Sequence, residues 1–165
     1  MITNDMEIIE IKDAPLTEIE KKGIRNGIAN LEDAILARPG TVYGDQPDMP
    51  LKHSFGENLY VREIFAPKGK IIVTKLHKKA HPFFLLKGVV SVLTDEGPRL
   101  IEAPYYGITP AGTKRAIYIH EDTVWVTVHA TEEKDLIKIE EDIIAKDYDE
   151  CLPTEAQATQ IEGGK

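Results

Sequence analysis

Short β-rich runs, separated by turn residues, fill the chain from residue 59 to residue 130 and constrain its fold more than any other feature. Seven such runs stand in this region: LYVREIFAP, KIIVTKLH, HPFFLL, GVVSVLT, RLIEAP, RAIYIH and DTVWVTVH. The segments between them, such as APKGK, DEGP and TPAGT, carry the glycine, proline and acidic residues of tight turns. Runs of this length and spacing predict a β-sandwich or a β-barrel.

Helical patterns flank this region on both sides. Before it, Thr17 and Glu20 have the spacing of a capping box, and apolar residues recur at helical intervals as far as Ile35. After it, an acidic segment carries Leu136 and Ile139 at the spacing of a surface helix. We therefore expect an N-terminal helix and ordered loop over 1–57, a barrel over 58–130, a C-terminal helix over 131–150 and a flexible tail over 151–165.

Composition limits the environment and the partners of the protein. The chain has 165 residues, which predicts one main domain, and no apolar run approaches the length of a membrane span. The N-terminus lacks the pattern of a signal peptide and Cys151 is the only cysteine, so we expect a cytoplasmic protein without disulfides. A formal net charge of -8 opposes binding to nucleic acid, because such binding needs cations that neutralise phosphates.

The stretch TKLHKKAHPFFLLKG, residues 74–88, holds the most chemically informative pattern in the chain. It places His77 and His81 four residues apart and closes on Gly88. Period-two alternation in the run before it puts Lys75 and His77 on the same face of the predicted strand. An amine and an imidazole are therefore expected to point the same way.

This stretch resembles the first motif of the cupin superfamily, G-x5-H-x-H-x3or4-E-x6-G. With the last glycine on Gly88, the first histidine, second histidine and glutamate positions fall on Lys75, His77 and His81. The segment PYYGITPAGTKRAIYI resembles the second motif, G-x5-P-x-G-x2-H-x3-N, whose histidine position falls on Arg115. The spacing of both motifs fits better than their residue types.

The resemblance covers about residues 59 to 130 and is closest to the small single-domain cupins of bacterial and phage genomes. It implies a mainly β protein with a cupin-type double-stranded β-helix, also called a jelly-roll barrel. The N-terminal amphipathic helix and the C-terminal surface helix would lie outside that barrel. Because small cupins commonly pair their barrels, we expect a homodimer.

In the usual cupin, three histidines and a glutamate at these positions bind iron, manganese, zinc, nickel or copper. Here Lys75 and Arg115 are cations that donate hydrogen bonds and repel a divalent ion. The first hypothesis is therefore a largely metal-free barrel, in which Lys75, His77, His81 and Arg115 bind a small anionic ligand such as a nucleotide, a sugar phosphate or a carboxylate. In a competing interpretation, Lys75 and Arg115 pair with acidic residues such as Glu63 and close a polar core.

Two further functions remain open. His77 and His81 are candidate ligands of a divalent transition metal in an isomerase or oxygenase, with Glu63 or His129 as the third ligand. Periodicity leaves the direction of His129 open, because the valines on the other face of its strand compete for the core; a satisfied or exposed strand histidine is the favoured interpretation. Alternatively, the barrel is a scaffold and the flanking helices form a surface for a protein partner.

Overall fold

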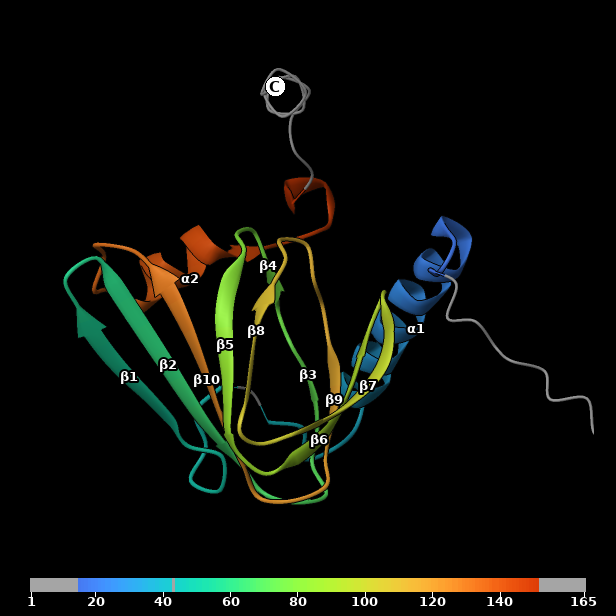
Figure 1. Cartoon of the computed structure of the whole chain (residues 1–165), viewed down its shortest axis with the longest axis horizontal. Helices are drawn as coiled ribbons and strands as arrows, with labels where there is room; N and C mark the ends of the chain where they lie inside the picture. The colour runs from blue at the N-terminus through green and yellow to red at the C-terminus, as the bar shows by residue number, and fades with distance from the viewer. Residues whose placement is uncertain (1–14, 43, 152–165) are drawn as a thin grey trace, which may run out of the picture.

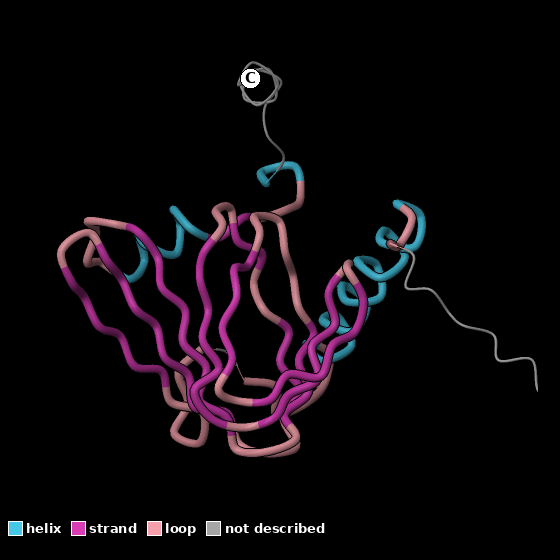
Figure 2. The backbone as a smooth tube through the Cα atoms, in the orientation of Figure 1, coloured by secondary structure: helices cyan, strands magenta, loops and turns pink. Residues whose placement is uncertain are grey.

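A computed structural model describes residues 15–42 and 44–151 as two facing antiparallel sheets with helices at their margins (Figure 1; Figure 2). The five-stranded sheet has the order β1 (Leu51–Gly56), β2 (Leu59–Ala66), β10 (Thr123–Ala130), β5 (His81–Lys87) and β8 (Tyr105–Thr109). The four-stranded sheet has the order β3 (Ile71–Val73), β9 (Ala116–Ile119), β6 (Val89–Thr94) and β7 (Gly97–Glu102). The mainly β fold with flanking helices is the predicted one.

A third, two-stranded sheet lies at the wide end of the molecule and pairs β4 (Leu76–His77) with β11 (Ile144–Ala145). The larger sheets spread apart toward this end and converge at the other (Figure 1). Helix α2 (Leu136–Ile143) and the 3-10 turn η1 (Asp149–Cys151) lie beside the two-stranded sheet. The wide end is therefore covered by the segment that follows the last long strand.

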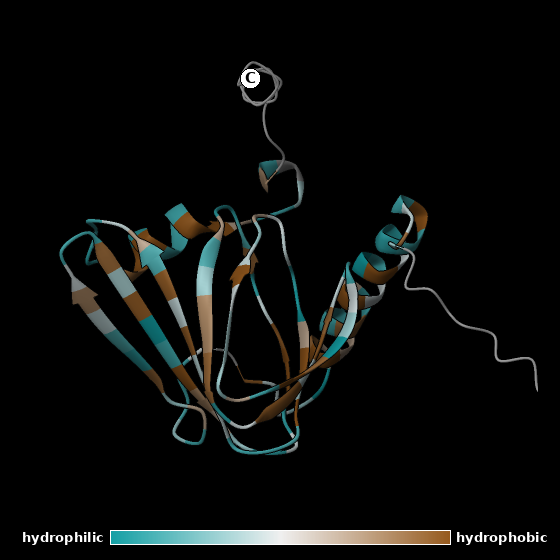
Figure 3. Ribbon diagram, in the orientation of Figure 1, coloured by the Kyte–Doolittle hydropathy of each residue, from teal (hydrophilic) through white to brown (hydrophobic). Residues whose placement is uncertain are grey.

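An apolar core fills the converging end. Alternation along β5 buries Phe83 and Leu85 between the sheets, and Trp125 of β10 lies opposite Leu85 in the register of the two strands. The remaining buried members of this core are Ala66, Val90, Val92, Ile101, Ile117 and Ile119. Hydrophobic residues accordingly mark both sheets where they converge (Figure 3). The same alternation carries His81, at the start of β5, to the inner side above this core.

Helix α1 (Glu18–Leu36) packs on the outside of the four-stranded sheet. Its predicted capping box is confirmed, because the side chain of Thr17 accepts from the backbone N–H of Glu20 and the Glu20 carboxylate accepts from that of Thr17. Arg25 anchors the helix through a hydrogen bond of 2.8 Å from Nη1 to Oδ2 of Asp95, in the turn between β6 and β7. No helix within the described ranges has both the length and the apolar character needed to cross a bilayer.

Two boundaries differ from those expected. The five-stranded sheet already begins at Leu51, because β1 pairs with β2 across a turn in which Asn58 has a φ of 57°. Helix α2 ends at Ile143, because the backbone then becomes extended and pairs with β4. The predicted tail falls, apart from Cys151, outside the described residues.

Candidate metal centre

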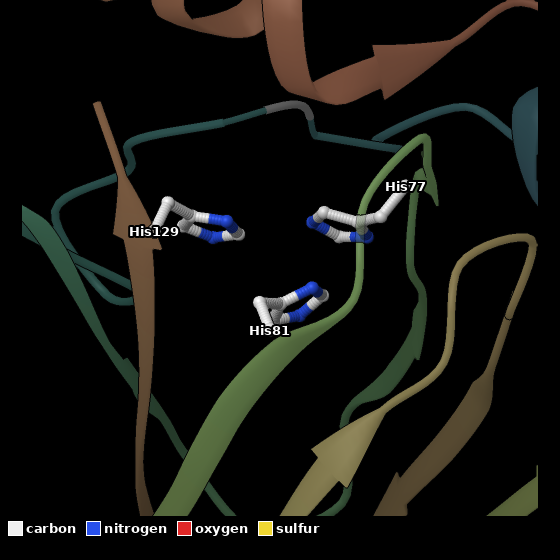
Figure 4. A group of neighbouring side chains, drawn as sticks. All are labelled: His77, His81 and His129. Carbon is white, nitrogen blue, oxygen red and sulfur yellow. The ribbon is translucent and has the colours of Figure 1, made fainter. Parts of the chain in front are cut away.

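Three histidines converge between the sheets at the wide end of the molecule (Figure 4). His77 comes from β4, His81 from β5 and His129 from β10, and one ring nitrogen of each lies within 4.8 Å of those of the other two. Their exposed fractions are 8%, 3% and 5%, so the group is almost closed to solvent. The chain thus gathers three imidazoles from segments that are far apart in sequence.

The backbone explains how they meet. His81 and His129 lie on neighbouring strands of the five-stranded sheet, and both alternate toward the inside. His77 approaches from the opposite side, because the chain leaves the four-stranded sheet after β3 and crosses to the two-stranded sheet. The ring centroids of His77 and His81 are 4.3 Å apart, and those of His81 and His129 are 4.5 Å apart.

Two ring nitrogens of this group have no hydrogen-bond partner within the described residues, although both are buried. They are Nδ1 of His77 and Nε2 of His81. The other nitrogen of His81, Nδ1, donates to the backbone oxygen of Lys79 at 3.3 Å, which leaves a lone pair on Nε2. A buried polar atom without a partner costs free energy, so this arrangement favours a bound ion that accepts the lone pairs.

Burial keeps the three imidazoles neutral at ordinary pH. Loss of solvation, reinforced by the neighbouring imidazoles and arginines, lowers the pKa of His77 to about 3. The same effect of burial lowers the pKa of His129 to about 4, and it also lowers the pKa of His81. A neutral imidazole is the form that coordinates a metal.

These pKa values predict that the metal-free protein loses stability in mild acid. Unfolded histidine takes up a proton near pH 6.5, whereas folded His77 and His129 stay neutral to about pH 3 and about pH 4. The unfolded state therefore binds more protons below pH 6.5, and each of the two histidines removes about 2 kcal/mol between about pH 7 and pH 5.

Urea denaturation in the presence of a chelator, repeated across this pH range, measures the effect. The His129→Gln variant should lose about 2 kcal/mol of the pH dependence over this range, the contribution of that one histidine. A wild-type unfolding free energy that does not change between these pH values contradicts the prediction.

Lys75 does not join the histidines, so the predicted orientation of this side chain is wrong. Its side chain is 53% exposed and its amine pairs with the carboxylate of Glu140 on α2. The strand is interrupted at Thr74 and Lys75, where the Thr74 backbone N–H donates to the backbone oxygen of Arg115 at 2.9 Å. This irregularity breaks the alternation that would have placed Lys75 and His77 on one face.

Glu63 is also absent from the group, whereas His129 belongs to it. In β2, Glu63 pairs with Val126 of β10 and so lies on the face opposite to that of His129. His129 is 5% exposed, so the expectation of an exposed strand histidine is wrong, whereas that of a satisfied one agrees with the 3.3 Å between its Nε2 and Oγ1 of Thr127. The alternative that made His129 a third ligand candidate also fits the geometry.

Arg115 lies inside, at the level of Phe83 and Trp125. Its exposed fraction is 7%, and its guanidinium stands 5.0 Å from the ring centre of Phe83 and 5.8 Å from that of Trp125. Nη2 donates a hydrogen bond of 2.6 Å to Oγ1 of Thr109. Burial lowers the pKa of Arg115 to about 10, so the side chain remains charged at neutral pH.

Two residues near the three histidines, Tyr60 and Arg62, were not predicted from the sequence. The Tyr60 ring stacks between His53 and His129, at centroid distances of 5.9 Å and 6.0 Å, and its hydroxyl is hydrogen-bonded to Nδ1 of His53 at 2.8 Å. The charge of Arg62 contributes to the lowered pKa of both His77 and His129. Alternation along β2 puts Tyr60 and Arg62 on one face, but only the pairing with β10 shows that this face is the inner one.

No protein-family profile and no curated protein matches the chain. Solved structures do match it at low sequence identity. The structure of KdgF from Halomonas sp. is 12% identical, with a TM-score of 0.48 and coverage of 57% of this chain and 90% of the other. The cupin domain of Schizosaccharomyces pombe Cnp3 is 18% identical, with a TM-score of 0.46 and coverage of 63% and 78%. A cupin superfamily protein from Desulfitobacterium hafniense is 10% identical, with a TM-score of 0.45 and coverage of 58% and 93%.

These likenesses concern the fold alone. The expected cupin features are present in the chain itself: two facing antiparallel sheets, a histidine-bearing segment that closes on Gly88, and a Pro-Ala-Gly-Thr turn that leads to a buried Arg115. The chain therefore has the mainly β, two-sheet arrangement with flanking helices that the motif resemblance predicts.

Proposed function

We propose that this protein binds a divalent transition-metal ion through His77, His81 and His129, and that it holds a small anionic ligand in the space between its sheets. The observation that carries the metal proposal is the convergence of three buried imidazole nitrogens within 4.8 Å of one another. This cluster favours the metal-containing interpretation over the largely metal-free pocket expected from the motif positions.

The donor set fits an ion such as Zn²⁺, Fe²⁺, Mn²⁺, Ni²⁺ or Cu²⁺, because imidazole suits borderline transition metals. Three protein ligands leave coordination positions open, as in catalytic rather than structural metal sites. When bound, such an ion acts as a Lewis acid toward a ligand in an open position. This fits either of the reaction classes expected from the sequence, isomerisation or oxygenation.

Charge around the centre supports an anionic ligand. Three neutral imidazoles leave the charge of a divalent ion uncompensated, and the positive charges of Arg62 and Arg115 both act on His77. The described residues offer no carboxylate within the histidine group. An anion from outside the chain would supply the missing negative charge in a setting where water screens poorly.

Elemental analysis of protein purified without an affinity tag tests the metal proposal. We expect about one equivalent of transition metal per chain, and a melting temperature that rises when Zn²⁺ or Co²⁺ is added to chelator-treated protein. Co²⁺-loaded protein should show the visible absorption of a nitrogen-ligated ion. Less than about a tenth of an equivalent, together with an unchanged melting temperature after addition of iron, manganese, zinc and nickel, would contradict the proposal.

A further inference from the structure

A cavity of about 230 Å³ lies between the two large sheets, where the edge strands β7 and β8 form its walls. Arg115 is the buried cation in its lining. The rest of the wall is mixed: its apolar or aromatic members include Phe83, Val92, Ile101, Tyr105 and Ile108, and its polar members include Thr94, Thr113 and Arg99. None of the three histidines belongs to this wall, although the charge of Arg115 also acts on His77 and His81.

Arg115 has no acidic partner in the described part of the chain. Its guanidinium makes one hydrogen bond, to the neutral hydroxyl of Thr109, and lies over the rings of Phe83 and Trp125. A guanidinium carries five N–H donors, so most of its hydrogen-bonding capacity is unused by the protein. A buried charge without a counterion is costly, and an anion in the cavity would offset that cost.

The carboxylates at the rim of the cavity do not supply this counterion. Asp95 accepts from Arg25 at 2.8 Å, and Glu96 lies 3.9 Å from Arg99. The two acidic residues of the lining are therefore already paired, Asp95 with Arg25 and Glu96 with Arg99, which itself lines the cavity. An incoming anion meets paired charges at the rim and an unpaired guanidinium inside.

Size and polarity of the cavity select among anions. A cavity of about 150 Å³ encloses benzene, so in proportion 230 Å³ encloses about nine non-hydrogen atoms. A mononucleotide, with about twenty or more such atoms, would leave about half of its atoms outside the cavity. Apolar atoms of a ligand would lie against Phe83, Val92 and Ile101, whereas polar atoms would have Thr94 and Thr113 in the same wall.

We infer that the cavity beside Arg115 takes a small carboxylate with an apolar or aromatic body, the carboxylate on the guanidinium and the body against Phe83, Tyr105 and Ile108. This inference rests on the proposed anion-binding function and narrows its ligand class. The planar fork of arginine matches the two oxygens of a carboxylate, and the apolar wall contributes through burial of the body.

Calorimetric titration with benzoate and benzamide tests the inference, because these probes have the same shape, about nine non-hydrogen atoms each, and differ in charge. We expect benzoate to bind at least about tenfold more tightly than benzamide, and more tightly than inorganic phosphate or AMP. Equal affinities for benzoate and benzamide, or a preference for phosphate or AMP, overturn the inference.

Two sets of variants locate the site. Arg115→Gln, with its fold checked by circular dichroism, should lose the preference for benzoate. Ile108 lines the cavity but is 66% exposed, so Ile108→Asp should fold and should weaken benzoate binding by at least about tenfold, whereas the neutral Ile108→Asn should not. Equal benzoate affinities in these two Ile108 variants would place the probe elsewhere and overturn the inference, whatever the fate of the Arg115 variant.

Metal content, measured in the same samples, separates the two proposals. A protein without metal that still prefers benzoate contradicts the metal centre and supports the Arg115 site. About one equivalent of metal, without any preference for benzoate, overturns the Arg115 site alone.

Discussion

Replacement of His129 by alanine is expected to weaken Zn²⁺ binding by more than about 100-fold. Loss of even a residue that only orients a metal ligand lowers affinity by about 10- to 100-fold, and His129 is one of three direct candidate ligands. No other described histidine, cysteine or carboxylate stands within the group to replace it. The dissociation constant, measured by competition with a chromogenic chelator, gives the size of the effect.

His120→Ala is the matched control for this experiment. His120 is another partly buried histidine of the same chain, but it lies in the turn between β9 and β10, where its Nε2 is 2.7 Å from Oγ of Ser91. Its removal should leave the Zn²⁺ affinity within about twofold of the wild type. If His129→Ala and His120→Ala bind Zn²⁺ equally well, His129 is not a ligand.

Replacement of Gly88 by alanine should be among the most destabilising single changes in the chain. Gly88 has a φ of 98°, and an added Cβ would lie 2.8 Å from the backbone oxygen of Asp122 and 2.9 Å from Cα of Thr123. It would also meet the hydroxyl of Thr123, a residue that is 1% exposed and donates to the backbone oxygen of Glu121 at 2.7 Å. Backbone strain and overpacking together predict a loss of about 3 kcal/mol or more.

Gly69→Ala isolates the contribution of the backbone. Gly69 has a similar φ of 85°, but a Cβ added there would have no atom of the described residues within 4 Å, apart from its own neighbours in the chain. The loss at Gly69 should therefore be about 1 kcal/mol, the strain of the backbone alone. Urea denaturation of the two variants and the wild type measures the loss of unfolding free energy at each position. Equal losses would show that the close approach of Gly88 to Thr123 does not contribute to the destabilisation.

The sequence predicted the fold well because its signals were local. The capping box of α1 involves two side chains three residues apart, and most of the β-rich runs became strands of the two large sheets. Gly88 shows why motif spacing is informative. Its positive φ and its close contact with Thr123 of β10 leave no room for a side chain at this position. Such requirements are visible in a sequence because they act on a single position.

The direction of side chains was harder to predict. His129 lies on β10, a central strand in which neighbouring residues such as Trp125 and Val126 are both buried, so alternation of hydrophobic residues could not identify the inner face. Lys75 was misplaced for a different reason. The strand is interrupted at Thr74 and Lys75, after which Leu76 and His77 pair with Ala145 and Ile144, a partner far along the chain.

The sequence by itself determined a mainly β chain whose motifs resemble those of cupins, with two histidines at a strand junction and an arginine where that resemblance places a third. Only the tertiary structure decided that His129 completes the group, that Lys75 points to Glu140, and that Arg115 is buried without a counterion. The physical reason is that strand spacing is set within short segments, whereas a binding site is set by pairings between strands that are distant in sequence.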